Sequence, residues 1–261
     1  MPWFKTKTAV TVAAVLLLAG AGLAAKRVFW PVTDSIFQLD SRKLEKAPAG
    51  IVLVRPTHFS DSAKSGVMVG GFKPGEAAQR LRVIGRNVPL TEVLQAAYAC
   101  NPARIVLPSD SPTDTYDFLV TTSKNPQERL QAEIKKKLGY VAHREMRDTE
   151  VLQLVISMPG APGLQPSGTD HGGMDYNNGK IRYRHQTIAA LAAYLEAMLK
   201  QPVRDKTGLS GFYDYSVDWN LHIRTGTPNR DDFAKSLQNM GLALKTGRET
   251  LEMLVVERVN N

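Results

Sequence analysis

The chain has 261 residues, of which 43% are hydrophobic and 22% are charged, with 20 Gly and 15 Pro. This composition is typical of a globular protein, and it excludes collagen, an intrinsically disordered chain and a membrane protein with many spans. The 33 basic and 25 acidic side chains give a net charge of +8, but four of the basic residues lie in residues 1–27, which hold no acid. Because the remaining positive charge forms no dense run, nucleic acid is not expected as a partner.

Residues 1–27 have the pattern of a segment that directs export. Basic residues precede and follow the 18 uncharged residues from Thr8 to Ala25, a stretch just long enough to cross a bilayer. Two interpretations remain open: a retained single-pass signal anchor, or a signal peptide cleaved near Ala19-Gly20-Ala21. The first places the folded part in the periplasm on an inner-membrane anchor, and the second gives a periplasmic or secreted protein.

Residues 28–49 are of mixed charge and end in Lys-Ala-Pro-Ala-Gly, which indicates a tether. A short strand at 51–54 and a glycine-containing loop at 66–75 follow. The only cysteine of the chain, Cys100, comes at the end of an apolar helical pattern. We expect it to be a buried structural thiol, and no intrachain disulfide is possible.

From residue 80 onward the same order of elements occurs twice. Helical faces with apolar residues at i, i+3, i+4 and i+7 recur, and Gly139 and Gly241 each follow a helix. Tyr116-Asp117-Phe118 corresponds to Tyr213-Asp214-Tyr215, so the two aspartates are expected to serve the fold. The expected elements of the first copy are strands 80–84, 104–107, 116–121, 140–146 and 151–157 with helices 90–99 and 126–138. Those of the second are strands 181–184, near 203, 212–219, 242–246 and 251–259 with helices 188–200 and 230–240.

Asn residues are expected to cap the second helix of each copy, at Asn125 and Asn229. The predicted fold class is α+β: two tandem repeated β-α-β-β-α-β-β units with mainly antiparallel sheets, preceded by one N-terminal hydrophobic helix. The predicted divisions are a signal segment (1–27), a tether (28–49), a first repeat with its leading strand and loop (50–157), a Pro/Gly linker (158–179) and a second repeat (180–261).

Several sequence segments resemble known families. Val88-Pro-Leu-Thr-Glu-Val-Leu94 followed by Ala103-Arg-Ile-Val106 is locally similar to the short N-terminal domains of secretins and TonB-dependent receptors. A second resemblance covers residues 50–259. It rests on Ala142-His-Arg-Glu-Met-Arg147, Leu164-Gln-Pro-Ser167 and Pro202-Val-Arg-Asp-Lys-Thr-Gly-Leu-Ser-Gly-Phe-Tyr-Asp214, which are similar to a soil-associated bacterial family of unknown function. That resemblance implies an exported, envelope-associated domain, sometimes attached to sensor-type membrane metallopeptidases, with no established reaction. The chain departs from the family pattern at 108–115.

Asp205-Lys-Thr-Gly208 matches the phosphorylated motif of P-type ATPases, but the chain has no room for their nucleotide and membrane domains. We expect a structural turn instead, in which Asp205 begins the turn and Gly208 and Gly211 supply positive φ. The five histidines form no His-x-x-x-His pair, so no zinc site is expected. No other metal, cofactor or catalytic residue is predicted.

Two further segments are candidates for a binding surface. One is His143-Arg144-Glu145, which is expected on a strand with His143 and Glu145 on the same face. The other is the inter-repeat loop, with Asp170, His171 and Asp175.

The sequence therefore favours a non-enzymatic envelope protein that binds another protein, a peptide or a glycan and reaches the membrane through its N-terminal helix. Two alternatives stay open. One is an accessory or sensor element of a membrane metallopeptidase signalling system. The other is a hydrolase that uses Asp170, His171, Asp175 and His185.

Overall fold

The computed structural model describes residues 34–61, 64–70, 82–177, 180–218 and 230–259. The expected N-terminal hydrophobic helix and the cap at Asn229 lie outside these residues. No helix in the described part of the chain is both long and apolar enough to span a membrane.

The fold is α+β with mainly antiparallel sheets, as expected, and five α-helices are described. The elements in chain order are η1 (Asp34–Gln38), α2 (Ser41–Lys46), β1 (Val52–Pro56), β2 (Gly66–Gly70), β3 (Arg82–Pro89), α3 (Leu90–Tyr98), η4 (Pro102–Arg104), β4 (Ile105–Val106), β5 (Thr115–Val120), α4 (Pro126–Leu138), β6 (Tyr140–Ile156), β7 (Leu164–Pro166), β8 (Gly173–Asn177), β9 (Lys180–Gln186), α5 (Ile188–Leu199), β10 (Val203–Asp205), β11 (Tyr213–Asp218), α6 (Arg230–Asn239) and β12 (Leu242–Arg258).

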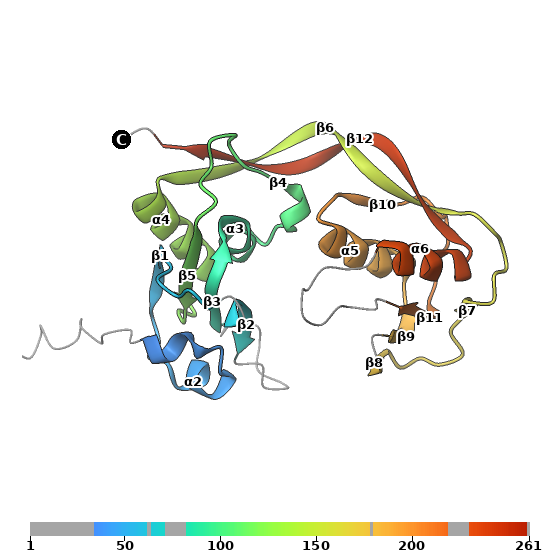
Figure 1. Cartoon of the computed structure of the whole chain (residues 1–261), viewed down its shortest axis with the longest axis horizontal. Helices are drawn as coiled ribbons and strands as arrows, with labels where there is room; N and C mark the ends of the chain where they lie inside the picture. Colours follow the sequence, from blue (N-terminus) through green and yellow to red (C-terminus); the bar gives the residue numbers. More distant parts are fainter. Residues whose placement is uncertain (1–33, 62–63, 71–81, 178–179, 219–229, 260–261) are drawn as a thin grey trace, which may run out of the picture.

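The described strands form three four-stranded sheets. We name them sheet A, in the order β1-β5-β3-β2, sheet B, in the order β10-β6-β12-β4, and sheet C, in the order β7-β11-β9-β8. Sheets A and C correspond strand by strand in chain order. Sheet B joins the two halves, because β6 and β12 pair antiparallel along their whole length and run over both halves (Figure 1).

Helices α3 to α6 lie between sheet B and the other two sheets, whereas α2 lies on the opposite side of sheet A (Figure 1). Leu90 and Leu94 of α3 and Leu130 and Ile134 of α4 pack between sheets A and B. In the second half, the buried side chains of α5 and α6 pack between sheets B and C: Ile188, Leu191, Ala192, Leu195, Phe233 and Leu237. The apolar helical spacing therefore identified the buried faces correctly.

The long strands differ from the expected pairs of shorter ones. The sequence indicated a break between residues 146 and 151 and another between 246 and 251, but β6 and β12 continue through both. The residues between the expected strands, 147–150 and 247–250, lie in the middle of the two-stranded ribbon. There, Arg248 of β12 donates to Asp148 of β6 at 2.8 Å, so the cross-strand partner accounts for the charge pattern.

Three segments expected as irregular contain regular elements. The glycine loop contributes the edge strand β2, and the segment expected as a linker contributes β7 and β8 to sheet C. The described part of the expected tether forms η1 and α2. Edge strands tolerate Gly and Pro, which explains why their composition looked like that of loops.

Gly139 ends α4 with φ +71°, as the sequence predicted. Asn125 differs from expectation, because its side chain makes no capping bond to the helix backbone. It donates from Nδ2 to Glu128 Oε2 at 2.6 Å instead. Cys100 is buried, as predicted.

Candidate functional site

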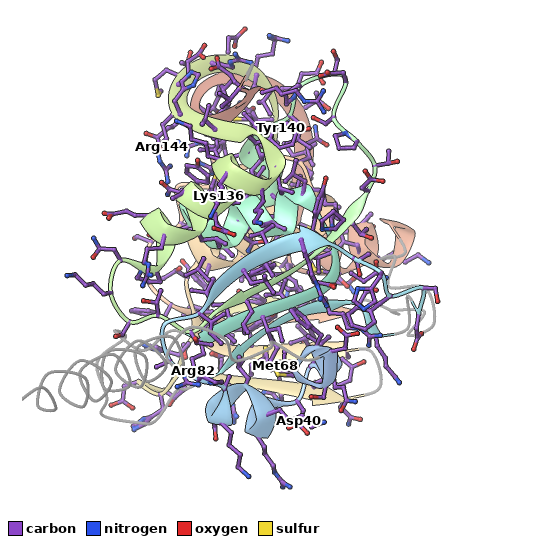
Figure 2. All side chains as sticks on the ribbon, turned by 90° about the vertical axis from the view of Figure 1, so that its left-hand side faces the viewer. Asp40, Met68, Arg82, Lys136, Tyr140 and Arg144 are labelled. Atoms are coloured by element: carbon purple, nitrogen blue, oxygen red, sulfur yellow. The ribbon has the colours of Figure 1, made fainter. Side chains whose placement is uncertain are left out.

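The outer face of sheet A, on the side away from α3 and α4, is apolar and covered. Ile84 of β3 and Leu119 of β5 pack there against Phe37 of η1 and Leu44 of α2, and all four are fully buried. Figure 2 shows Met68 and Arg82 on this side of the sheet, next to α2, with Lys136 on α4 on the opposite side.

The outer face of sheet C is polar and uncovered by any described element. One pair of corresponding positions shows the contrast. In sheet A, Met68 of β2 lies opposite Ile84 of β3, whereas in sheet C, Asp175 of β8 lies opposite Arg182 of β9. The position that corresponds to Leu119 on β5 is Ser216 on β11. Polar residues thus replace apolar ones at the points where sheet A receives its cover.

A hollow of about 910 Å³ lies over this polar face. Side chains of all four strands of sheet C line it, and the end of α6 and residues 162–163 form part of its wall. We call this hollow the sheet C groove. Its lining residues are Pro162, Gly163, Gln165, Asp175, Asn177, Lys180, Arg182, Asp214, Tyr215, Ser216, Asn239 and Met240.

Cations alternate along β9 at the groove. Lys180, Arg182 and Arg184 are exposed, while Ile181 and Tyr183 between them contribute to the core. This follows from the twofold alternation of side chains in a strand. Arg184 pairs with Asp175 of β8 at 3.0 Å. Lys180 and Arg182 form no ion pair with another described residue.

Asp214 of β11 is held by the backbone. The N–H of His185 donates to Asp214 Oδ1 at 2.9 Å. This bond, the hydroxyl of Ser167 and the charges of Arg182 and Arg184 hold the pKa of Asp214 below its ordinary value. The carboxylate therefore stays charged and accepts hydrogen bonds, and it is poorly suited to act as a general acid near neutral pH.

Asp117 in sheet A has the corresponding contacts. It is fully buried, and its Oδ1 accepts from the Asn87 N–H at 3.0 Å and from the Thr57 hydroxyl at 2.9 Å. Asn87 and His185 both have positive φ, +51° and +52°. The two aspartates thus support equivalent irregular points of their sheets, in agreement with the fold role expected from their symmetry.

The His143-Arg144-Glu145 segment lies on β6 in sheet B, apart from the residues that line the sheet C groove. His143 and Glu145 share a face, with Nε2 and Oε2 3.4 Å apart. Arg144 points to the other face, where it pairs with Glu252 at 2.6 Å and donates to the Tyr98 carbonyl at 3.0 Å. Arg147, followed by His143, lowers the pKa of Glu145. These contacts form an exposed polar ladder along the ribbon.

The inter-repeat residues are divided between a loop and the groove. Asp170 and His171 contact each other, and both side chains are 88% exposed. Asp175 lies on β8 and lines the sheet C groove. His185, which the hydrolase alternative adds, stacks on the Phe212 ring with centroids 3.9 Å apart. Within the described ranges, no three His, Cys, Asp or Glu residues lie together as a metal site.

The segment after β10 has the geometry of a turn. Asp205 Oδ1 accepts from the N–H of Thr207 at 2.9 Å and from its hydroxyl at 2.7 Å. Gly208 and Gly211 have φ of +69° and +93°. The Asp205 carboxylate is thus engaged locally, which is the arrangement that a structural turn requires.

Residues 91–259 match a known family, described as a protein of unknown function (DUF3738). The chain belongs to the DUF3738 family. The DUF3738 match begins inside α3 and includes every residue that lines the sheet C groove, whereas η1, α2 and strands β1 to β3 precede it. No curated protein and no solved structure matches the chain.

Sequence reasoning identified Asp175 but missed Lys180, Arg182, Asp214 and Ser216 as residues of one face. A signal was present in the alternation Lys180-Ile-Arg-Tyr-Arg184, which predicts a strand with a cationic side. The corresponding stretch of β3 has the apolar Ile84 where β9 has Arg182. That difference distinguishes the covered face of sheet A from the face of sheet C, which no described element covers.

Proposed function

We propose that the chain is a non-enzymatic binding module of the cell envelope and that it receives its partner in the sheet C groove. The observation that carries this proposal is the contrast between two corresponding sheet faces. One is apolar and covered by the chain's own η1 and α2, and the other is polar, hollowed and not covered by any element that the structure describes. Exposed polar groups on a rigid sheet suit recognition, because strands hold side chains at fixed spacing.

A binding role fits the state of the groove carboxylates better than a catalytic one. Asp175 is paired with Arg184, and Asp214 is engaged by the His185 N–H with a lowered pKa. The lowered pKa of Asp214 is the opposite of the raised pKa that an acid catalyst needs. The hydrolase alternative requires Asp170 and His171 to work with Asp175 and His185. Asp170 and His171 contact each other, whereas Asp175 pairs with Arg184 and His185 stacks on Phe212.

The same proposal includes a tandem repeat and an envelope location. The matching strand orders of sheets A and C, and the equivalent contacts of Asp117 and Asp214, support an origin by duplication. The basic and apolar pattern of residues 1–27 supports export. The role as an accessory of a membrane metallopeptidase rests on the family resemblance alone.

Site-specific photocrosslinking in intact cells tests the binding face. A benzophenone side chain at Ser216 inside the groove should yield a crosslinked adduct, and the same group at Lys136, which is exposed on α4, should not. The Ser216 adduct should disappear with Arg182→Glu and persist with Lys136→Glu. No adduct at Ser216, or equal adducts at both positions, would contradict the proposal.

The location is tested separately. A reporter enzyme that is active only in the cytoplasm, fused after Asn261, should give no activity in cells that express the full chain. Reporter activity would overturn the export of residues 50–259.

A further inference from the structure

The cover of sheet A shows how the chain occupies a face of this kind. Arg82 of β3 donates from Nη1 to the carbonyl oxygens of Leu44, at 2.9 Å, and Ala47 at the end of α2. Arg55 of β1 binds the Asp34 carboxylate of η1 at 2.8 Å. Cations of the sheet thus hold the oxygen atoms of a short polypeptide segment that lies across it.

Sheet C also has cations on its outer face, but none of the described segments covers them. Lys180 on β9 corresponds to Arg82 on β3. Arg82 lies five residues before Asn87, whose N–H binds Asp117, and Lys180 lies five residues before His185, whose N–H binds Asp214. Arg182, two residues on, stands where Ile84 contacts the cover. Both Lys180 and Arg182 are exposed, and neither is ion-paired within the described part of the chain.

We propose that the sheet C groove binds an acidic polypeptide segment of a partner protein. This inference rests on the proposed function and names its ligand. The two cations project from the same face of one strand about 7 Å apart, a spacing that side chains of one peptide can bridge. The hollow of about 910 Å³ far exceeds the volume of a single small anion, which favours a segment of chain as the occupant.

Other groups of the groove suit a peptide backbone. Gln165, Asn177 and Ser216 line it and offer both donors and acceptors. The carboxylates of Asp175 and Asp214 lie among the cations, so a continuous row of phosphates would meet repulsion there. An acidic peptide avoids this, because its carboxylates can be placed opposite the cations and its amide N–H groups opposite the aspartates.

The test measures binding of fluorescent poly-L-glutamate to the full chain by anisotropy at about 0.1 M salt, where exposed charges more than about 10 Å apart are largely screened. We expect binding to weaken about tenfold or more in the double variant Lys180→Glu/Arg182→Glu, because two attractive charge contacts become repulsive. The matched control is Lys135→Glu/Lys136→Glu, an equal charge change on the exposed surface of α4. It should alter binding by no more than about twofold, since surface charges at a distance are screened.

Three outcomes would overturn the inference. Equal weakening in both double variants would show a general attraction to a chain of net charge +8. Binding of inorganic phosphate or of the acidic polysaccharide polygalacturonate in preference to poly-L-glutamate, with the same dependence on Lys180 and Arg182, would exclude a polypeptide. No binding of poly-L-glutamate, with the Ser216 crosslink still formed, would refute the acidic ligand while the proposed function stands.

Discussion

Asp117 and Asp214 show how a carboxylate stabilises an irregular point in a strand. The pairing registers of β3 with β5 and of β9 with β11 shift near Asn87 and His185, which have left-handed backbone conformations. Such conformations cost on the order of 1–3 kcal/mol in non-glycine residues. The register shift leaves this N–H without a partner in the neighbouring strand, and the aspartate accepts its hydrogen bond instead. The free-energy cost of the irregular point is therefore lower.

The Asp214 contact predicts a pH dependence of stability. Because the folded pKa lies below the ordinary value of 3.8, the charged carboxylate stabilises the fold above that pH, and this contribution is lost as the pH falls through the folded pKa. Asp214→Asn should therefore lower the thermal midpoint well above pH 3.8. The gap between variant and wild type should narrow as the solution becomes more acidic.

Thermal unfolding followed by circular dichroism over a pH series measures this gap. Asp170→Asn is the control, because the Asp170 side chain is 88% exposed and exposed ion pairs contribute little. A gap for Asp214→Asn that stays constant from neutral to acidic pH would contradict the prediction.

The helices could be predicted from the sequence, but the ribbon could not. Local spacing defined α3 and α5, since Leu90 and Ile188 each begin a buried face. The continuity of β6 depends instead on β12, which pairs with it about 100 residues later. Asp148 lies in the break that the sequence indicated, and its charge is explained only by its cross-strand partner Arg248, which a single local segment cannot reveal.

The sheet C groove was only partly predictable for a similar reason. Asp175 was identified from a local cluster of polar residues. Arg182 acquires its significance only from comparison with Ile84, at the corresponding point of a separate sheet. That comparison requires the strand orders and registers of both sheets.

At the level of elements, α5 offers a sharp test of the core. Leu191 is 1% exposed and packs in the second core. Burial of a leucine contributes roughly 1.5–3 kcal/mol, and a carboxylate in its place adds a further penalty for burying charge. We expect Leu191→Asp to reduce the free energy of unfolding by at least about 3 kcal/mol, measured by urea denaturation.

Ala193→Asp provides the matched control two residues along the same helix. Ala193 is exposed, so the change should cost only the difference in helix propensity, about 0.7 kcal/mol. Equal effects of the two substitutions would show that the buried face of α5 has been assigned incorrectly.

The whole molecule is held together by an exchange of strands between its halves. Val256, near the end of β12, packs in the first core, while Leu154, near the end of β6, packs in the second. In sheet B, β4 of the first half pairs with β12, and β10 of the second half pairs with β6. Neither core is complete without a strand from the other half, so we expect the halves to unfold together.

One ion pair adds to this connection. Arg104, at the end of η4, donates to both oxygens of Glu196 on α5, at 2.7 and 2.9 Å. The Glu196 side chain is 3% exposed and that of Arg104 is 29% exposed. Glu196 Oε2 also accepts from the Val203 N–H at 3.0 Å, so the carboxylate joins the first half to both α5 and β10.

Arg104→Met should therefore destabilise the whole chain, because it leaves Glu196 buried without its cation. The expected loss is about 2–3 kcal/mol, below the range for fully buried pairs because Arg104 is partly exposed to solvent. Adding Glu196→Gln removes the uncompensated charge and keeps an acceptor for the Val203 N–H, so the double variant should regain much of the lost stability.

In each variant a single unfolding transition, measured by calorimetry, should shift as a unit. Two separate transitions would show that the halves are independent, and additive losses in the double variant would show that Arg104 and Glu196 are not coupled.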